Sequence, residues 1–168
     1  MHCNVGNVIL KLVSNNTGGY MSAIWFDSND VGDSFEFGEV HVTENEILEF
    51  AKKYDPQPFH VDEVQAGNSI YGGLIASGWH TISMCMRLIV DNMLIPDSGC
   101  LGSPGADNVM WSQPVRPGDT LKVKAELLEK IPSKSKPDRG FWVIKFIAFN
   151  QNNEDVMNMT IKIYLRKR

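Results

Sequence analysis

Residues 79–94, from Trp79 to Leu94, read WHTISMCMRLIVDNML and contain few polar side chains. This composition predicts a long helix that is buried on most sides, because a helix that is apolar nearly all round cannot face water. Its polar residues fall on a single stripe formed by His80, Ser83, Arg87 and Asp91. The remainder of the chain must therefore cover this helix.

The sequence that follows the helix changes to the two-residue period typical of strands. Apolar and polar side chains alternate most clearly in residues 121–127 and 157–165, where every second position is apolar. The four strands that we expect here are Val109–Val115, Leu121–Leu127, Phe141–Phe149 and Met157–Leu165. The connections between them are short, so neighbouring strands should run antiparallel.

The sequence before the helix contributes one strand and further helical material. Residues 35–42 alternate as a strand does, and Thr43 and Glu46 then form a capping box that starts a helix. That helix should stop at Asp55, because Pro56 disfavours helical geometry in the residue before it. Residues 55–76 are expected to be irregular, with one short helix after Asp62. The element order predicts an α+β fold in which an antiparallel sheet wraps a central helix.

Composition limits the class of protein. The 168 residues fit a single domain, and 43% hydrophobic with 21% charged residues is ordinary for a globular protein. A net charge of −4 gives a nucleic-acid partner little electrostatic support, so none is expected. No stretch approaches the length of a membrane span, so no membrane partner is expected. Residues 1–20 differ in character, and we expect them to be an N-terminal extension of a domain at 21–168, with an ordinary extra strand as the alternative.

The cysteines indicate a reducing compartment. Cys3, Cys85 and Cys100 are odd in number and include no CxxC pair, which disfavours a disulfide framework and a zinc site. We therefore expect a cytoplasmic protein with no bound metal. Cys85 lies among apolar residues and is expected to be an unreactive core thiol.

Two segments carry groups that could perform chemistry. Asp55 and His60 lie five residues apart on a loop stiffened by Pro56 and Pro58, and such a pair could hold one water and divide two proton transfers. Gly78 lies at the start of the long helix, where free N–H groups could stabilise a negatively charged oxygen. Spacing alone also allows structural interpretations: a turn at Asp55, and close helix packing at the glycine.

Taken together, these segments resemble the MaoC-like dehydratases, in particular their (R)-specific enoyl-CoA hydratase group. The residues that carry the likeness are DPQPFH at 55–60, GLIASG at 73–78 and WSQPVRPGD at 111–119. It extends from about Trp25 to Arg168. The resemblance implies a hotdog fold, in which five antiparallel strands wrap a long central helix.

The resemblance also implies a reaction in fatty acid metabolism: reversible addition of water to a trans-2-enoyl-CoA, giving an (R)-3-hydroxyacyl-CoA. Asp55 and His60 would activate the water, and the Gly78 N–H would bind the thioester oxygen. Four neighbouring residues are predicted to contact the substrate: Phe59, Gly73, Ser77 and Trp79. The acyl-CoA thioester is the substrate and no cofactor is implied. We expect a homodimer or a larger assembly of dimers, because hotdog domains leave sheet edges that dimerisation buries.

Ser77 departs from the family pattern, which usually has histidine before the helix-start glycine. Ser77 could bond near the thioester, or it could serve as the N-cap of the helix. Two other activities stay open on the same fold. A thioesterase usually carries its carboxylate on the central helix, where this chain has no acid before Asp91. A non-catalytic acyl-CoA binding module would normally show a partner-contacting region, and none is visible.

Overall fold

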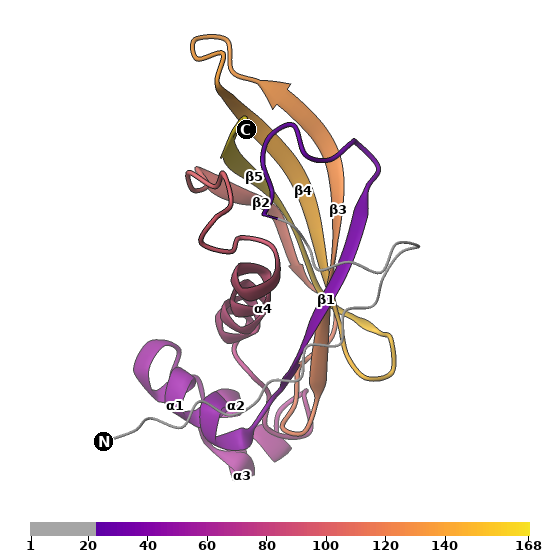
Figure 1. The fold of residues 1–168 in the computed structure, drawn as a ribbon. Helices are drawn as coiled ribbons and strands as arrows, with labels where there is room; N and C mark the ends of the chain where they lie inside the picture. The colour runs from indigo at the N-terminus through magenta and orange to yellow at the C-terminus, as the bar shows by residue number, and fades with distance from the viewer. Residues whose placement is uncertain (1–22) are drawn as a thin grey trace, which may run out of the picture.

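The fold is described from a computed structural model of the chain, in which residues 23–168 are placed. Five strands form one antiparallel sheet in the order β1-β3-β4-β5-β2. They are β1 (Ser34–His41), β2 (Gly105–Trp111), β3 (Thr120–Pro132), β4 (Arg139–Phe149) and β5 (Asp155–Arg166). The sheet curves around helix α4 (Gly78–Asn92), as Figure 1 shows. The predicted α+β hotdog architecture is confirmed; the proposed extension at 1–20 lies outside the described residues.

Side-chain alternation in the long strands builds the core. On β3, Leu121, Val123, Ala125 and Leu127 are fully buried, as the alternating pattern predicts. On β4, the same inner face presents four fully buried residues: Trp142, Ile144, Phe146 and Ala148. Burying this apolar surface against α4 is the main force that holds the sheet on the helix.

Helix α4 is buried on one side rather than on most sides. Met84, Cys85, Leu88 and Ile89 face the core, whereas Val90 is 41% exposed. The prediction of near-complete burial was too strong, because one sheet covers one face of a helix. His80 also departs from the predicted polar stripe, since it is buried.

Three short helices lie together near one end of α4 (Figure 1). They are α1 (Glu44–Tyr54), α2 (Pro58–Val61) and α3 (Glu63–Gly67). The predicted capping box at Thr43 is present, and α1 ends before Asp55 as expected. Helix α3 is the predicted short helix, whereas α2 was not predicted; it is one turn long with Pro58 at its start.

The strand predicted at 109–115 begins and ends four residues earlier. Beyond Trp111 the chain leaves the sheet, and the Val115 carbonyl accepts the Ala76 N–H at 2.8 Å. Pro114 has no N–H to donate to a strand ladder, which disfavours continued pairing. This departure brings the segment after β2 alongside the loop that leads into α4.

Candidate active site

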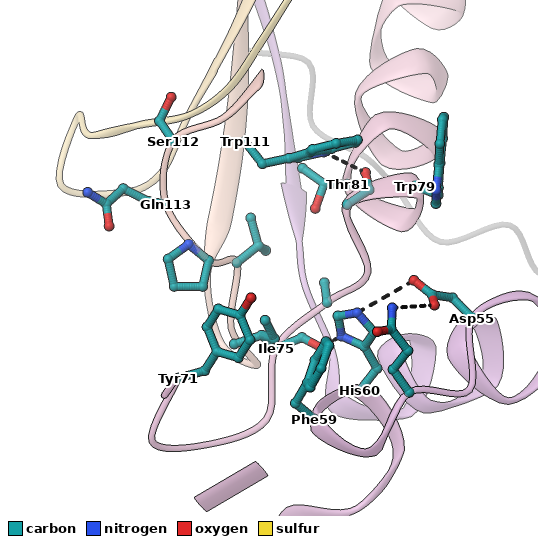
Figure 2. A pocket seen from close by; sticks show the side chains of 15 residues that line it. Asp55, Phe59, His60, Tyr71, Ile75, Trp79, Thr81, Trp111, Ser112 and Gln113 are labelled. Carbon is teal, nitrogen blue, oxygen red and sulfur yellow. Dashed lines mark hydrogen bonds and ion pairs between the residues drawn. The ribbon is translucent and has the colours of Figure 1, made fainter. Parts of the chain in front are cut away.

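A cleft of about 510 Å³ lies where the helical segment, the start of α4 and the end of β2 meet. Figure 2 shows Asp55 and His60 pointing toward each other on one side of it, with Trp111 across from them. The residues that line the cleft include Asp55, His60, Tyr71, Gly78, Trp79 and Trp111. Three separate segments of the chain are therefore joined in one site.

Asp55 is held by donors at both of its carboxylate oxygens. It caps the C-terminus of α1, and its own N–H donates to the Ala51 carbonyl at 2.9 Å. Ser77 Oγ donates to Asp55 Oδ2 at 2.7 Å, and Gln57 Nε2 donates to Oδ1 at 2.8 Å. The Ser77 hydroxyl, and after it the Gln57 amide, hold the pKa of the Asp55 carboxyl below its usual range, while partial burial opposes them. Asp55 is therefore a carboxylate at neutral pH.

One ring nitrogen of His60 is hydrogen-bonded to the backbone, and the other faces the Asp55 carboxylate. The ring is buried on α2, and its Nδ1 lies 2.8 Å from the carbonyl oxygen of Ile75. A carbonyl can only accept, so Nδ1 must carry the proton and donate it. Nε2 lies 3.5 Å from Asp55 Oδ2. This geometry leaves Nε2 available for proton exchange at the edge of the cleft.

The start of α4 supplies a free donor to the same cleft. Ser77 is the N-cap, and its Oγ accepts the Trp79 N–H at 3.2 Å. Within residues 23–168 the Gly78 N–H has no hydrogen-bond acceptor, and it lies at the positive end of the helix. A carbonyl oxygen placed there would have developing negative charge stabilised.

Trp111 explains why position 78 is a glycine. A Cβ added at Gly78 would lie 2.4 Å from Trp111 Cε2, which is closer than real Cβ contacts. The Trp111 Nε1–H also donates to the Gly78 carbonyl at 3.0 Å. The indole therefore packs directly on the residue that carries the free N–H.

Aromatic rings form much of the remaining wall. Phe59 contacts Tyr71 with ring centroids 5.1 Å apart, and Trp79 meets Trp111 edge to face at 5.7 Å. Such rings supply an apolar surface for an acyl chain or its carrier arm.

Five of the seven predicted site residues line the cleft, and the other two do not. Asp55, Phe59, His60, Gly78 and Trp79 line it together. Ser77 is buried, 1% exposed, directly behind the wall. Gly73 does not line the cleft and lies beside the Arg116 guanidinium.

The cleft lining also contains residues that were not singled out from the sequence, among them Gln57, Tyr71 and Trp111. Gln57 lies inside the segment that suggested the site, and Trp111 begins the 111–119 segment that carried part of the resemblance. Those two positions therefore had a signal that could have been used. Nothing in the sequence distinguishes Tyr71 from an ordinary loop tyrosine.

The other chemical groups lie away from the cleft. Arg87 pairs with Asp91 at 2.7 Å, an ordinary i,i+4 pair on the exposed face of α4. Cys85 is fully buried, and burial raises the pKa of its thiol to about 12, as expected of an unreactive core thiol. Across residues 23–168, no cluster of three or more potential metal ligands occurs. No helix in that part of the chain is long and apolar enough to cross a membrane.

Comparison with known proteins relates this geometry to one family. The model of the family described as MaoC like domain matches residues 27–139. The uncharacterized protein YdeM of Bacillus subtilis (strain 168) is 26% identical over 141 residues, covering 84% of this chain and 98% of that protein.

Two solved structures are similar over most of this chain. The MaoC-like dehydratase from Rhodospirillum rubrum is 40% identical with a TM-score of 0.81, over 87% of this chain and 99% of that one. The unliganded R-hydratase PhaJ1 from Pseudomonas aeruginosa is 25% identical with a TM-score of 0.69, over 87% of this chain and 88% of that one.

Proposed function

Because the chain belongs to the MaoC-like domain family, we propose that it is a hydro-lyase that adds water reversibly to a trans-2-enoyl-CoA. The observation that carries this proposal is the facing pair of Asp55 and His60, 3.5 Å apart, beside the free Gly78 N–H. Hydration needs a proton acceptor for water, a proton donor for C2 of the substrate, and a site for the charge that develops on the thioester oxygen. These three requirements match the groups that line the cleft.

In the proposed reaction, Asp55 and His60 activate one water molecule between them. The ionised Asp55 accepts a hydrogen bond from the water, and Nε2 of His60 takes its proton. The water oxygen bonds to C3 of the enoyl-CoA, and the displaced electron pair moves toward C2 and the thioester oxygen. The Gly78 N–H stabilises that oxygen while the pair returns a proton to C2. The product is a 3-hydroxyacyl-CoA, in the (R) form that the family resemblance implies, and dehydration is the reverse.

The substrate is proposed to lie along the aromatic wall. Phe59 and Trp79 would contact the acyl chain or the arm that carries it. This placement follows from the cleft lining for Phe59 and Trp79. The thioester would be CoA-linked and would need no cofactor.

Absorbance of the conjugated enoyl-thioester tests the proposal. Purified protein is mixed with crotonyl-CoA and with longer and branched trans-2-enoyl-CoAs, and the absorbance is expected to fall as water adds. Asp55→Asn and His60→Gln should each lower the rate at least about 100-fold, since each removes a group that handles the proton.

Asp91→Asn and His41→Gln serve as matched controls, because both residues are exposed and lie outside the cleft. Their rates should equal that of the wild type. Release of free CoA thiol would instead identify a thioesterase. Acyl-CoA binding without turnover would identify a binding module, and either result would overturn the hydratase proposal.

We also propose that the protein is a homodimer joined through the β2 edge of its sheet. Met110 and Trp111 on this strand are 60% and 44% exposed. An exposed apolar edge strand is prone to pair with another strand. Trp111 also lines the cleft, so a partner at this edge would help to enclose it.

A further inference from the structure

Ser77 connects two parts of the site through a single oxygen atom. Its Oγ accepts the Trp79 N–H at 3.2 Å and donates to Asp55 Oδ2 at 2.7 Å. We propose that Ser77, together with Gln57, is a positioning residue that fixes the Asp55 carboxylate and ties it to the start of α4. This inference rests on the proposed hydratase function and deepens it.

The chemistry of a hydroxyl suits this double task. A serine hydroxyl has one donor and two acceptor sites, whereas an aspartate N-cap has acceptors alone at neutral pH. Capping α4 uses an acceptor site of Ser77 and leaves the proton for Asp55. Because Ser77 is 1% exposed, water cannot readily replace either contact. The residue at this position thus determines whether the carboxylate has a donor from the helix start.

The two donors also restrict what Asp55 can do. Gln57 occupies Oδ1 and Ser77 occupies Oδ2, the oxygen that lies 3.5 Å from His60 Nε2. Rotation of the carboxylate would break both hydrogen bonds, so its orientation toward His60 is held. Donors to a carboxylate favour its charged form. Asp55 is therefore suited to stay charged through the cycle, and His60 to carry the moving proton.

The inference predicts a change in the titration of Asp55 that can be measured without any enzymatic activity. Carbon-13 NMR of the side-chain carboxyl would follow Asp55 against pH in the wild type and in Ser77→Ala. Loss of one hydrogen bond to a charged oxygen should raise the pKa of Asp55 by about one unit. Ser77→Thr keeps the hydroxyl and should titrate as the wild type does.

Two further variants separate positioning from helix capping and from folding. Thr43→Ala removes an N-cap from α1, where Thr43 Oγ1 accepts the Glu46 N–H at 3.3 Å far from Asp55, so it should leave Asp55 unchanged. Gln57→Ala removes the second donor from an exposed position that should tolerate it, and should also raise the pKa of Asp55.

Steady-state kinetics give a second readout. In Ser77→Ala, kcat should fall about tenfold while KM changes less than about twofold, because a carboxylate out of position weakens transition-state stabilisation more than substrate binding. An Asp55 titration that is the same in Ser77→Ala, Gln57→Ala and wild type would overturn the inference. An equal shift in Thr43→Ala would also overturn it. If the titration shifts as expected but no enoyl-CoA is hydrated, the positioning of Asp55 stands and the proposed function fails.

Discussion

At the scale of single residues, Gly78 and Trp111 pack so closely that neither residue can be enlarged or moved without displacing the other. In Gly78→Ala the new Cβ would lie 2.4 Å from Trp111 Cε2, so the indole must move and its 3.0 Å hydrogen bond to the Gly78 carbonyl must break. Because displacement of a catalytic donor by about 1 Å can cost 100-fold, we expect kcat/KM to fall by about that factor. Steady-state kinetics would measure this, and tryptophan fluorescence should change as Trp111 moves.

Gly105→Ala is the matched control for that experiment. Gly105 lies on the same strand as Trp111, and an added Cβ there meets nothing within 4 Å. Its kcat/KM should equal that of the wild type. Unchanged kcat/KM in Gly78→Ala would mean that the contact between Trp111 and Gly78 does not hold the Gly78 N–H in its catalytic position.

His80 is a second residue with a measurable consequence. It is buried, its Nδ1 has no hydrogen-bond partner within the described chain, and its ring stacks on Phe50 at 4.7 Å. Burial lowers the pKa of His80, with the Glu46 carboxylate opposing this. The unfolded chain therefore binds a proton at a higher pH than the folded chain does. Stability contributed by neutral His80 is present above about pH 6.5 and is lost as the pH falls below it.

His80→Phe should remove this dependence, because phenylalanine keeps the stacking surface and cannot be protonated. Thermal unfolding between pH 7.5 and pH 5 would measure the effect. We expect the Tm of the wild type to fall over this range by roughly 2–4 °C more than that of His80→Phe. His41→Gln, at an exposed histidine, should behave as the wild type does. Parallel loss of Tm in wild type and His80→Phe would show that His80 does not titrate on unfolding.

At the scale of elements, β1 and α4 meet through a glycine. Gly38 has φ of +73° at an irregularity in β1, and an added Cβ would lie 2.6 Å from Leu88 Cδ2. Gly38→Ala must accept an unfavourable backbone conformation and must also displace a buried leucine. We expect it to lower the free energy of unfolding by about 2–4 kcal/mol, measured by urea denaturation.

Gly67→Ala provides the comparison for that prediction. Gly67 lies at the end of α3, and an added Cβ there would meet nothing within 4 Å. Its free energy of unfolding should be unchanged or slightly higher, since alanine favours helix over glycine. If the two variants unfold at the same urea concentration, Gly38 does not limit the packing of β1 on α4.

The elements differ in how far the sequence could predict them. Strands β3 and β5 were predictable because alternation of apolar and polar side chains indicates that one face of a strand is buried. Helix α1 was predictable because a capping box is a local sequence signal. Strand β2 was placed four residues too late, since its residues are mostly exposed and alternate weakly. The apolar spacing of α1 continues from the buried Ile47 and Ala51 to Tyr54, yet Tyr54 is 63% exposed because the last turn of that helix has little to pack against.

The site was predictable to a similar extent. Asp55 and His60 lie five residues apart in one segment, so their proximity is a local property that the sequence carries. The hydrogen bond from Ser77 to Asp55 joins residues 22 apart, and Trp111 reaches Gly78 across 33 residues. Such contacts depend on how the sheet places its loops, and neither composition nor periodicity encodes that placement.

At the scale of the whole molecule, the edges of the sheet lead to the last prediction. Within residues 23–168, β1 and β2 are the edge strands. The β1 edge is interrupted at Gly38 and carries Glu36 and Glu39, features that discourage pairing. The β2 edge instead exposes Met110 and Trp111. A second copy of the chain is therefore expected at β2, which would give a dimer of twice 18.8 kDa.

Met110→Lys should shift this dimer toward the monomer in sedimentation experiments at micromolar concentration, because a charge would be buried without a partner. Hydratase activity should fall in parallel, since Trp111 on the same strand forms part of the cleft wall. Val31→Lys places the same charge at another exposed apolar position, 58% exposed, and should leave the dimer intact. A wild-type protein that sediments as a monomer at full activity would refute the dimer, and the cleft would then be complete within one chain. A dimer that persists in Met110→Lys would place the interface away from β2.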